Sequence, residues 1–201
     1  MIYRLLSTIS IIFLFTISYT QTIQSPKEYF SHYGKQHSFH HQIVEYIKYT
    51  DPLSDKMTVK KYGETAQGRP LQLIFISDPE NLKNLEDIRL TNLVNAGMSS
   101  KQPNKKIEKA IVWCSFGVHG NEAGTTESSI NILHQLLTSN TAAEWLKNTV
   151  VIMDPSLNPD GYDRYVHFLK NASGELTHPD ANSREHMEPW PTGRYNHYMF
   201  D

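Results

Sequence analysis

A histidine and a glutamate, His119 and Glu122, stand three residues apart in the glycine-rich segment His-Gly-Asn-Glu. An imidazole nitrogen and a carboxylate oxygen are both ligands of Zn²⁺, and a catalytic zinc ion uses about three protein ligands and a water molecule. Glycines before, within and after the pair allow a turn with close backbone approach. The helical H-E-x-x-H zinc motif is excluded, because glycine follows His119. The pair therefore predicts part of a zinc site in a loop.

The flanking patterns place this loop at the end of a buried strand. Residues 110–116 form a near-continuous apolar run, which predicts a strand buried on both faces. Residues 125–137 follow with helical spacing, and residues 149–153 predict a second buried strand. Strand, helix and strand in this order predict a parallel crossover unit. Ligands bind at the carboxyl ends of such strands, and the turn-forming residues 158–161, Asn-Pro-Asp-Gly, can border the same cleft.

The rest of the chain predicts further helices and an antiparallel pair of strands. Apolar spacing indicates a helix over residues 37–49, with a His-His pair at its solvated start. Strands are predicted over residues 57–62 and 71–76, and another helix over residues 82–94. The last forty-odd residues show no sustained period and are predicted to be irregular. The predicted fold is α/β, with three layers (α/β/α) around a mixed, mainly parallel sheet.

Composition and charge exclude several classes of protein. The chain has 201 residues, an apolar share of 39% and a net charge of -2. This is enough apolar material for a folded core, and there is no basic excess of the kind that binds nucleic acid. The single cysteine, Cys114, excludes an intrachain disulfide and a cysteine-based zinc site.

The first twenty residues have the pattern of a secretory signal peptide. Arg4 gives a positive start, an apolar run covers residues 5–19, and cleavage is predicted near Thr20. The alternative, a transmembrane anchor, needs about 18 or more apolar residues. We therefore expect a mature domain over residues 21–201 that is secreted or periplasmic, without a stable membrane anchor.

Three motifs, taken together and in this order, resemble those of one enzyme family. They are His119-Gly-Asn-Glu122, the Asn158-Pro-Asp-Gly161 turn, and Gly193-Arg194-Tyr-Asn196 ahead of Phe200-Asp201. The chain resembles the zinc metallocarboxypeptidases (carboxypeptidase A/B-like) over residues 57–201. Residues 182–191 are similar to a secreted bacterial subgroup of that family.

The resemblance implies an exported zinc-dependent carboxypeptidase that hydrolyses C-terminal peptide bonds, with one Zn²⁺ as cofactor and peptide or protein C-termini as substrate. It assigns His119 and Glu122 as the first two zinc ligands. It assigns Arg194 as the catalytic and substrate-binding arginine that stabilises the oxyanion, with Arg184 as the second candidate. Asn121 stands where many members carry a substrate-binding arginine, so that contact is not carried over.

The family's third zinc ligand, a histidine, and its general base, a glutamate, have no assigned counterpart in the sequence. The resemblance places both beyond Asp201, so we expect the N-terminal part of a catalytic domain, incomplete at its C-terminal end and with exposed sheet surface. Glu127 either orients His119 or is an ordinary helix carboxylate. The histidines considered as substitute ligands are His134, His167, His178, His186 and His197.

Two other functions are compatible with these residues. One is a zinc amidohydrolase of the same fold, such as a deacylase, with the same ligand loop and different substrate contacts. The other is a catalytically inert truncated chain, or a binding module that keeps the scaffold.

Overall fold

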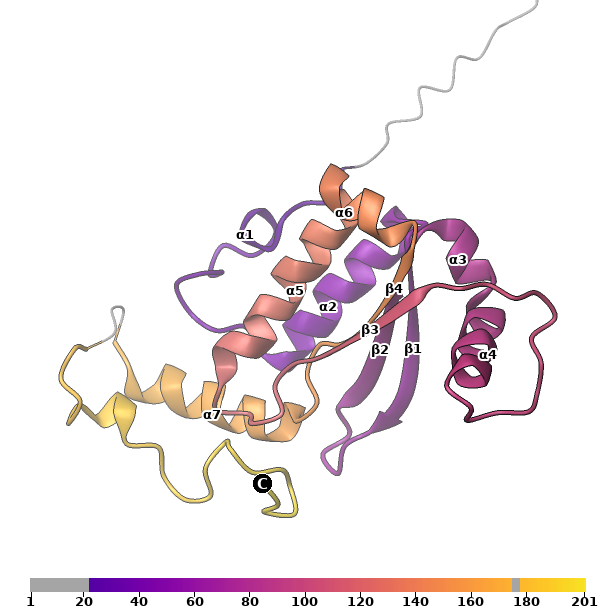
Figure 1. Cartoon of the computed structure of the whole chain (residues 1–201). Helices are drawn as coiled ribbons and strands as arrows, with labels where there is room; N and C mark the ends of the chain where they lie inside the picture. The colour runs from indigo at the N-terminus through magenta and orange to yellow at the C-terminus, as the bar shows by residue number, and fades with distance from the viewer. Residues whose placement is uncertain (1–21, 175–177) are drawn as a thin grey trace, which may run out of the picture.

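The computed structural model describes residues 22–174 and 178–201 (Figure 1). The predicted signal peptide, residues 1–20, lies outside the described residues. The strands are β1 (Met57–Glu64), β2 (Pro70–Ile76), β3 (Ala110–Ser115) and β4 (Thr149–Asp154). The helices are α1 (Pro26–Tyr29), α2 (His40–Thr50), α3 (Pro79–Lys83), α4 (Leu85–Asn95), α5 (Ala123–Thr138), α6 (Asn140–Leu146) and α7 (Pro159–Ala172). Within the described ranges, no helix is long and apolar enough to cross a bilayer.

The strands form one mixed sheet in the order β1-β2-β4-β3. β2 pairs antiparallel with both β1 and β4, whereas β3 and β4 pair in parallel, with Val112 opposite Val151. Helices α2 and α5 lie on one side of the sheet, and α3 and α4 lie on the other (Figure 1). The prediction of an α/β fold with a mixed sheet is confirmed. The expectation of a mainly parallel sheet is corrected for the described strands, because β2 runs against both of its neighbours.

The main core fills the space between the sheet and helices α2 and α5. On α2, Ile43, Tyr46 and Ile47 share one face and have no exposed surface. The facing stripe of α5 contains Ile130 and Leu133, which are also fully buried. The sheet residues that close this core are Met57, Ile74, Ile76, Val151 and Met153. The apolar residues that recur with helical spacing on α2 and α5 therefore pack against those that face one side of the sheet.

Strand β3 lies at the edge of the sheet, and its apolar side chains are largely exposed. The exposed fractions are 38% for Ile111, 44% for Val112 and 59% for Trp113. The prediction of a strand buried on both faces is therefore wrong for the described part of the chain, because β4 is the one strand that pairs with β3 there. This strand is also where the expected exposed sheet surface is found.

Helix α7 occupies a stretch for which the sequence predicted a turn and an irregular tail. The side chain of Asn158 caps the helix by accepting from the Gly161 N–H at 3.0 Å, and a proline takes the first helical position. Tyr162 and Val166 lie four residues apart on one face and are fully buried. These signals are visible in the sequence, but Asn, Pro, Asp and Gly also form turns. The irregular prediction holds for residues 178–201, apart from one short 3₁₀ turn.

The first residue of α2, His40, is buried, so the predicted solvated start is wrong for this residue. Only 4% of its surface is exposed, and its backbone N–H donates to Asp163 Oδ1 at 2.8 Å. Arg69, from the turn between β1 and β2, bonds Asp163 and Asp160 at 2.7 and 2.8 Å. Burial lowers the pKa of His40 to about 4. The cause is the packing of α7 over the start of α2, which the sequence pattern did not reveal.

Candidate metal centre

The loops that follow β3 and β4 lie side by side, because backbone hydrogen bonds continue beyond the strand ends. Phe116 N–H donates to Asp154 O at 2.9 Å, and Leu157 N–H donates to Phe116 O at 2.8 Å. Asn158 N–H then donates to Gly117 O at 3.0 Å. Gly117 has a φ of +63°, in the left-handed region that favours glycine, so the chain can turn sharply there. The two loops therefore border one site at the carboxyl ends of the parallel strands.

Three glycines allow the His119 loop, the start of α7 and the C-terminal segment to meet. A β-carbon on Gly120 would lie 2.2 Å from the backbone of Gly161 and 2.3 Å from the carbonyl oxygen of Gly193. A β-carbon on Gly161 would lie 2.3 Å from that same oxygen. No side chain fits at either position without moving backbone. The contact brings Arg194, the residue after Gly193, beside the ligand loop.

Glu188 links the ligand loop to the C-terminal segment. Its carboxylate accepts from Asn121 Nδ2 at 3.1 Å and also from the backbone N–H of Gly193. Asn121 thus holds the loop in place, at the position where many family members carry a substrate-binding arginine. Sequence reasoning missed Glu188, and no spacing rule connects it with Asn121.

Helix α7 fixes the backbone around Arg194. Arg164 donates to the carbonyl oxygens of Thr192 and Tyr195, at 2.8 and 3.3 Å. Asn158 Nδ2 donates to Arg194 O at 3.2 Å. The helix that the sequence analysis did not predict is therefore the element that positions the predicted catalytic arginine.

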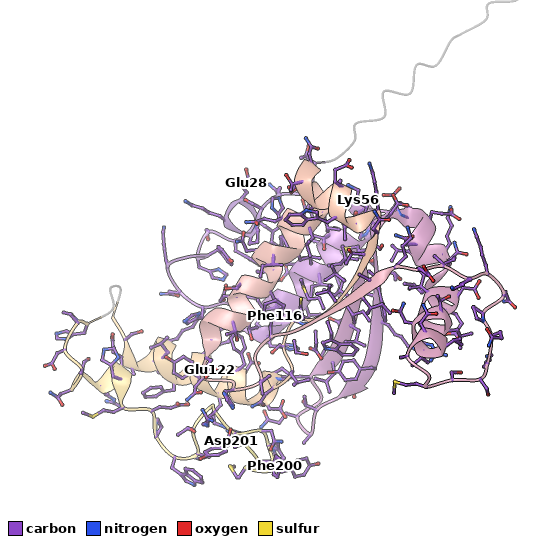
Figure 2. All side chains as sticks on the ribbon, in the orientation of Figure 1. Glu28, Lys56, Phe116, Glu122, Phe200 and Asp201 are labelled. Carbon is purple, nitrogen blue, oxygen red and sulfur yellow. The ribbon has the colours of Figure 1, made fainter. Side chains whose placement is uncertain are left out.

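The carboxylate of Asp201 contacts two of the predicted site residues, His119 and Arg194, and His119 in turn contacts the third, Glu122. His119 Nδ1 lies 3.2 Å from Glu122 Oε1, and His119 Nε2 lies 3.0 Å from Asp201 Oδ1. Arg194 Nε donates to the other oxygen, Asp201 Oδ2, at 2.9 Å. Figure 2 shows Glu122 and Asp201 at the same end of the molecule, near the end of β3. One carboxylate therefore joins a predicted zinc ligand to the predicted oxyanion donor.

The distance between the two predicted ligands fits a zinc ion. Two atoms that lie about 2.05 Å from zinc at a tetrahedral angle are about 3.3 Å apart. The separation of 3.2 Å between His119 Nδ1 and Glu122 Oε1 is close to this value. A zinc-binding histidine usually donates its other ring N–H to a carboxylate, which fixes the ring and its tautomer, and Asp201 is placed to accept from Nε2. The donor set therefore fits part of a zinc centre.

Asp201 remains ionised in this arrangement. The hydrogen bond from Arg194, together with the positive charge of Arg194, holds the pKa of Asp201 below its usual value. An ionised carboxylate can accept from both neighbours at once. The sequence contained Asp201 at the end of the third motif, but the pattern gave no reason to pair it with His119.

A third protein ligand is not found in residues 22–174 and 178–201, where no group of three or more His, Cys, Asp and Glu side chains is placed to hold a metal ion. The substitute histidines contact other parts of the molecule. His134 Nε2 lies 3.3 Å from Ile23 O, and His167 packs on Phe39 with ring centres 4.6 Å apart. The rest, in the C-terminal segment, are His178 and His186, which contact each other, and His197, which lies 3.4 Å from Gln67 Nε2.

Two other candidate residues lie away from the ligand pair. Glu127 Oε1 accepts from Ser38 N–H and from Tyr162 Oη, so it contacts the start of α2 and α7 rather than orienting His119. Arg184 is exposed at the start of a 3₁₀ turn, whereas Arg194 bonds the same carboxylate as His119. The geometry therefore favours Arg194 over Arg184 for the oxyanion role, which stays a prediction.

An α/β domain with a zinc-type ligand pair beside an arginine fits the class of metal-dependent hydrolases. Residues 43–198 match the zinc carboxypeptidase family, and the chain belongs to that family. None of the curated proteins gives a significant match.

Solved carboxypeptidase structures share the fold. Carboxypeptidase A from Helicoverpa armigera is 18% identical with a TM-score of 0.51, over 81% of this chain and 29% of that one. Thrombin activatable fibrinolysis inhibitor is 16% identical with a TM-score of 0.50, over 68% of this chain and 29% of that one. The present chain thus spans about 29% of the length of either structure.

Proposed function

We propose that the chain is part of an exported zinc-dependent carboxypeptidase, which uses one Zn²⁺ to hydrolyse C-terminal peptide bonds in peptides or proteins. Membership of the zinc carboxypeptidase family supports the reaction type. The observation that carries the proposal is the carboxylate of Asp201, which bonds His119 on one oxygen and Arg194 on the other. This carboxylate holds the predicted metal ligand beside the predicted oxyanion donor. Export is proposed from the signal-peptide pattern of residues 1–20.

Each residue of the site has a distinct task in this mechanism. A zinc ion bound there would supply Lewis-acid polarisation of the scissile carbonyl and would activate water. His119 and Glu122 would hold the ion, and Asp201 would keep the imidazole ring oriented. Arg194 bonds Asp201 through Nε, so its terminal guanidinium nitrogens remain available to the developing oxyanion. Loss of one such donor typically lowers the rate by about 10²–10³-fold.

The third zinc ligand and the general base are not assigned to any described residue. Zinc affinity depends on the number and geometry of the ligands, so His119 and Glu122 alone would give a weak and poorly selective site. The proposed activity is therefore that of a protein that contains a third zinc ligand and a general base in addition to His119 and Glu122. A histidine and a glutamate are the residue types that the family resemblance predicts for them.

The test is peptidase activity of the complete protein on a peptide with a free C-terminus and on its amidated counterpart. His119→Ala, Glu122→Ala or chelation should abolish hydrolysis of the free peptide, and Arg194→Ala should lower kcat by about 10²–10³-fold. His134→Ala is the matched control, because His134 lies on α5 and faces Ile23 rather than the site. This control should keep its activity and its bound zinc.

The same experiment separates the alternative functions. Equal hydrolysis of free and amidated peptides would overturn the carboxypeptidase proposal in favour of an amidohydrolase. Activity that survives both chelation and His119→Ala would overturn the zinc mechanism itself. A protein with no bound zinc and no hydrolysis of either peptide would be the inert form.

A further inference from the structure

A cavity lies away from the candidate metal centre, between the segment before α2 and the helices α5 and α7. Its volume is about 350 Å³, within the size range of small-molecule sites. We call it the rear cavity, and none of the residues of the His119 site lines it. The lining residues used below are Tyr33, His37, Glu127, Val166, Leu169 and Lys170.

Glu127 lines the rear cavity. Its Oε1 accepts from the Ser38 N–H and from Tyr162 Oη, and the hydroxyl of Tyr33 donates to its backbone oxygen at 3.0 Å. These contacts fix the side chain. Among the described residues, Oε2 has no hydrogen-bond partner. It is not one of the buried atoms that lack a partner, so it is accessible to solvent. One negatively charged acceptor is therefore held in position and left available.

Lys170 presents a positive charge to the same cavity. Its ammonium lies 4.2 Å from the centre of the Phe39 ring, a cation–π contact that holds it in place. Within residues 22–174 and 178–201, no carboxylate lies within 4.0 Å of this ammonium, although Glu127 lines the same cavity. His37 also lines the cavity and makes no side-chain hydrogen bond to a described residue. The cavity thus holds opposite charges that do not pair with each other.

The rest of the wall is mixed: it contains the polar side chains of Lys35, Gln36, Ser128 and Ser173, and two apolar residues of α7. Val166 is fully buried and Leu169 is half-buried, and both project from α7 near Lys170. A ligand with an anionic, a cationic and an apolar group within a small volume can meet Lys170, Glu127 and Leu169 together.

We propose that the rear cavity binds a free α-amino acid with an apolar side chain. The carboxylate of the ligand pairs with Lys170 and accepts a hydrogen bond from His37, its ammonium pairs with Glu127, and its side chain packs on Leu169. The cavity chemistry carries this inference without the proposed function. If the proposed function holds, the ligand is also the chemical class of product that the enzyme releases, and the cavity is a product site separate from the metal centre.

The test is isothermal titration of the full chain with L-leucine, N-acetyl-L-leucine and L-leucinamide. We expect L-leucine to bind with a Kd of about 1 mM, and each analogue, which lacks one of the two charges, to bind at least about tenfold more weakly. Lys170→Met should weaken L-leucine binding by about tenfold or more. Lys83→Met, on the exposed surface of α3, is the matched control and should bind as the unaltered chain does. Amide NMR shifts caused by L-leucine should fall on residues 33–38, 127 and 166–170.

Three outcomes would overturn the inference: no binding of L-leucine, analogues that bind as tightly as L-leucine, or Lys170→Met that binds as tightly as the control. His119→Ala separates this inference from the proposed function. Leucine binding should persist in His119→Ala even if peptidase activity and zinc are lost. Loss of leucine binding in that variant would place the ligand at the metal centre and overturn the rear cavity as its site.

Discussion

Strands β3 and β4 are neighbours of equal length and similar composition, yet the side chains of β3 are exposed and those of β4 are mostly buried. They pair in parallel along their whole length, and both are apolar runs. In β4, Val150 and Met153 are 2% and 0% exposed, whereas in β3 Val112 and Trp113 are 44% and 59% exposed. The difference comes from position, because β4 lies between β2 and β3, and β3 forms the edge of the described sheet. Apolar composition thus indicates that a strand is suited to burial, but not which neighbours cover it.

The segments after the two strands also differ in their tasks. β3 leads into the loop that carries His119 and Glu122, the residues with predicted chemistry. β4 leads into Asn158 and α7, which supply backbone contacts and caps. The exposed strand β3 therefore leads into the predicted zinc ligands, and the buried strand β4 leads into the residues that hold the neighbouring backbone in place. Three predictions, taken from the largest expected effect to the smallest, test this difference between the two strands.

Gly120→Ala should have the largest effect, because it separates the two loops. Its β-carbon would lie 2.2 Å from the backbone of Gly161, so the chain must move, and we expect a loss of more than about 4 kcal/mol in the free energy of unfolding. Gly124→Ala is the matched control, because its β-carbon meets nothing within 4 Å and alanine favours the helix by up to about 1 kcal/mol. Urea unfolding of both variants is the measurement. Equal stability of the two would contradict the close glycine contact.

Acid should lower the free energy of unfolding through His40, which is buried where α7 packs over the start of α2. Its pKa is about 4 in the folded chain, below the ordinary value of 6.5, so the unfolded state binds more protons between these values. The contribution of neutral His40 is fully present above pH 6.5 and is lost as the pH falls through about 4, a total of about 3 kcal/mol. Unfolding free energy measured from pH 7 to pH 4 should show this decline, in addition to that from the carboxylates.

The histidine contribution can be separated from the carboxylates by two variants. His40→Gln should remove the part of the pH dependence that lies between pH 6.5 and 4, because glutamine does not titrate. His41→Gln alters the exposed neighbour and should keep the full decline. A decline that is the same in all three chains would show that His40 does not contribute.

The smallest expected change in stability comes from replacing one valine in each of the two strands. Val151 and Val112 are cross-strand partners of the same residue type, at 8% and 44% exposure. Val151→Ala should cost about 2 kcal/mol, because it removes two buried methyl-sized groups and leaves a cavity. Val112→Ala should cost about 0.5 kcal/mol. Chemical denaturation compares them, and similar costs would mean that β3 is covered in solution.

Much of the secondary structure could be predicted from periodicity, and the failures have identifiable causes. The strands and the helices α2 and α5 follow from their apolar spacing. The predicted helix over residues 82–94 is divided into α3 and α4 at Asn84. Helix α7 was missed because its capping residues are also turn residues. The burial of His40 depends on α7 packing over it, and no local pattern encodes such a contact.

The sequence by itself determined the family resemblance, the ligand pair His119 and Glu122 and the candidate Arg194, because these depend on residue type and local order. Only the tertiary structure decided that Asp201 joins His119 to Arg194, since the two segments meet through backbone contact at glycines. It also decided that β3 is exposed and β4 is buried. Local spacing fixes which face of an element is apolar, whereas contacts between distant segments depend on how the whole chain packs.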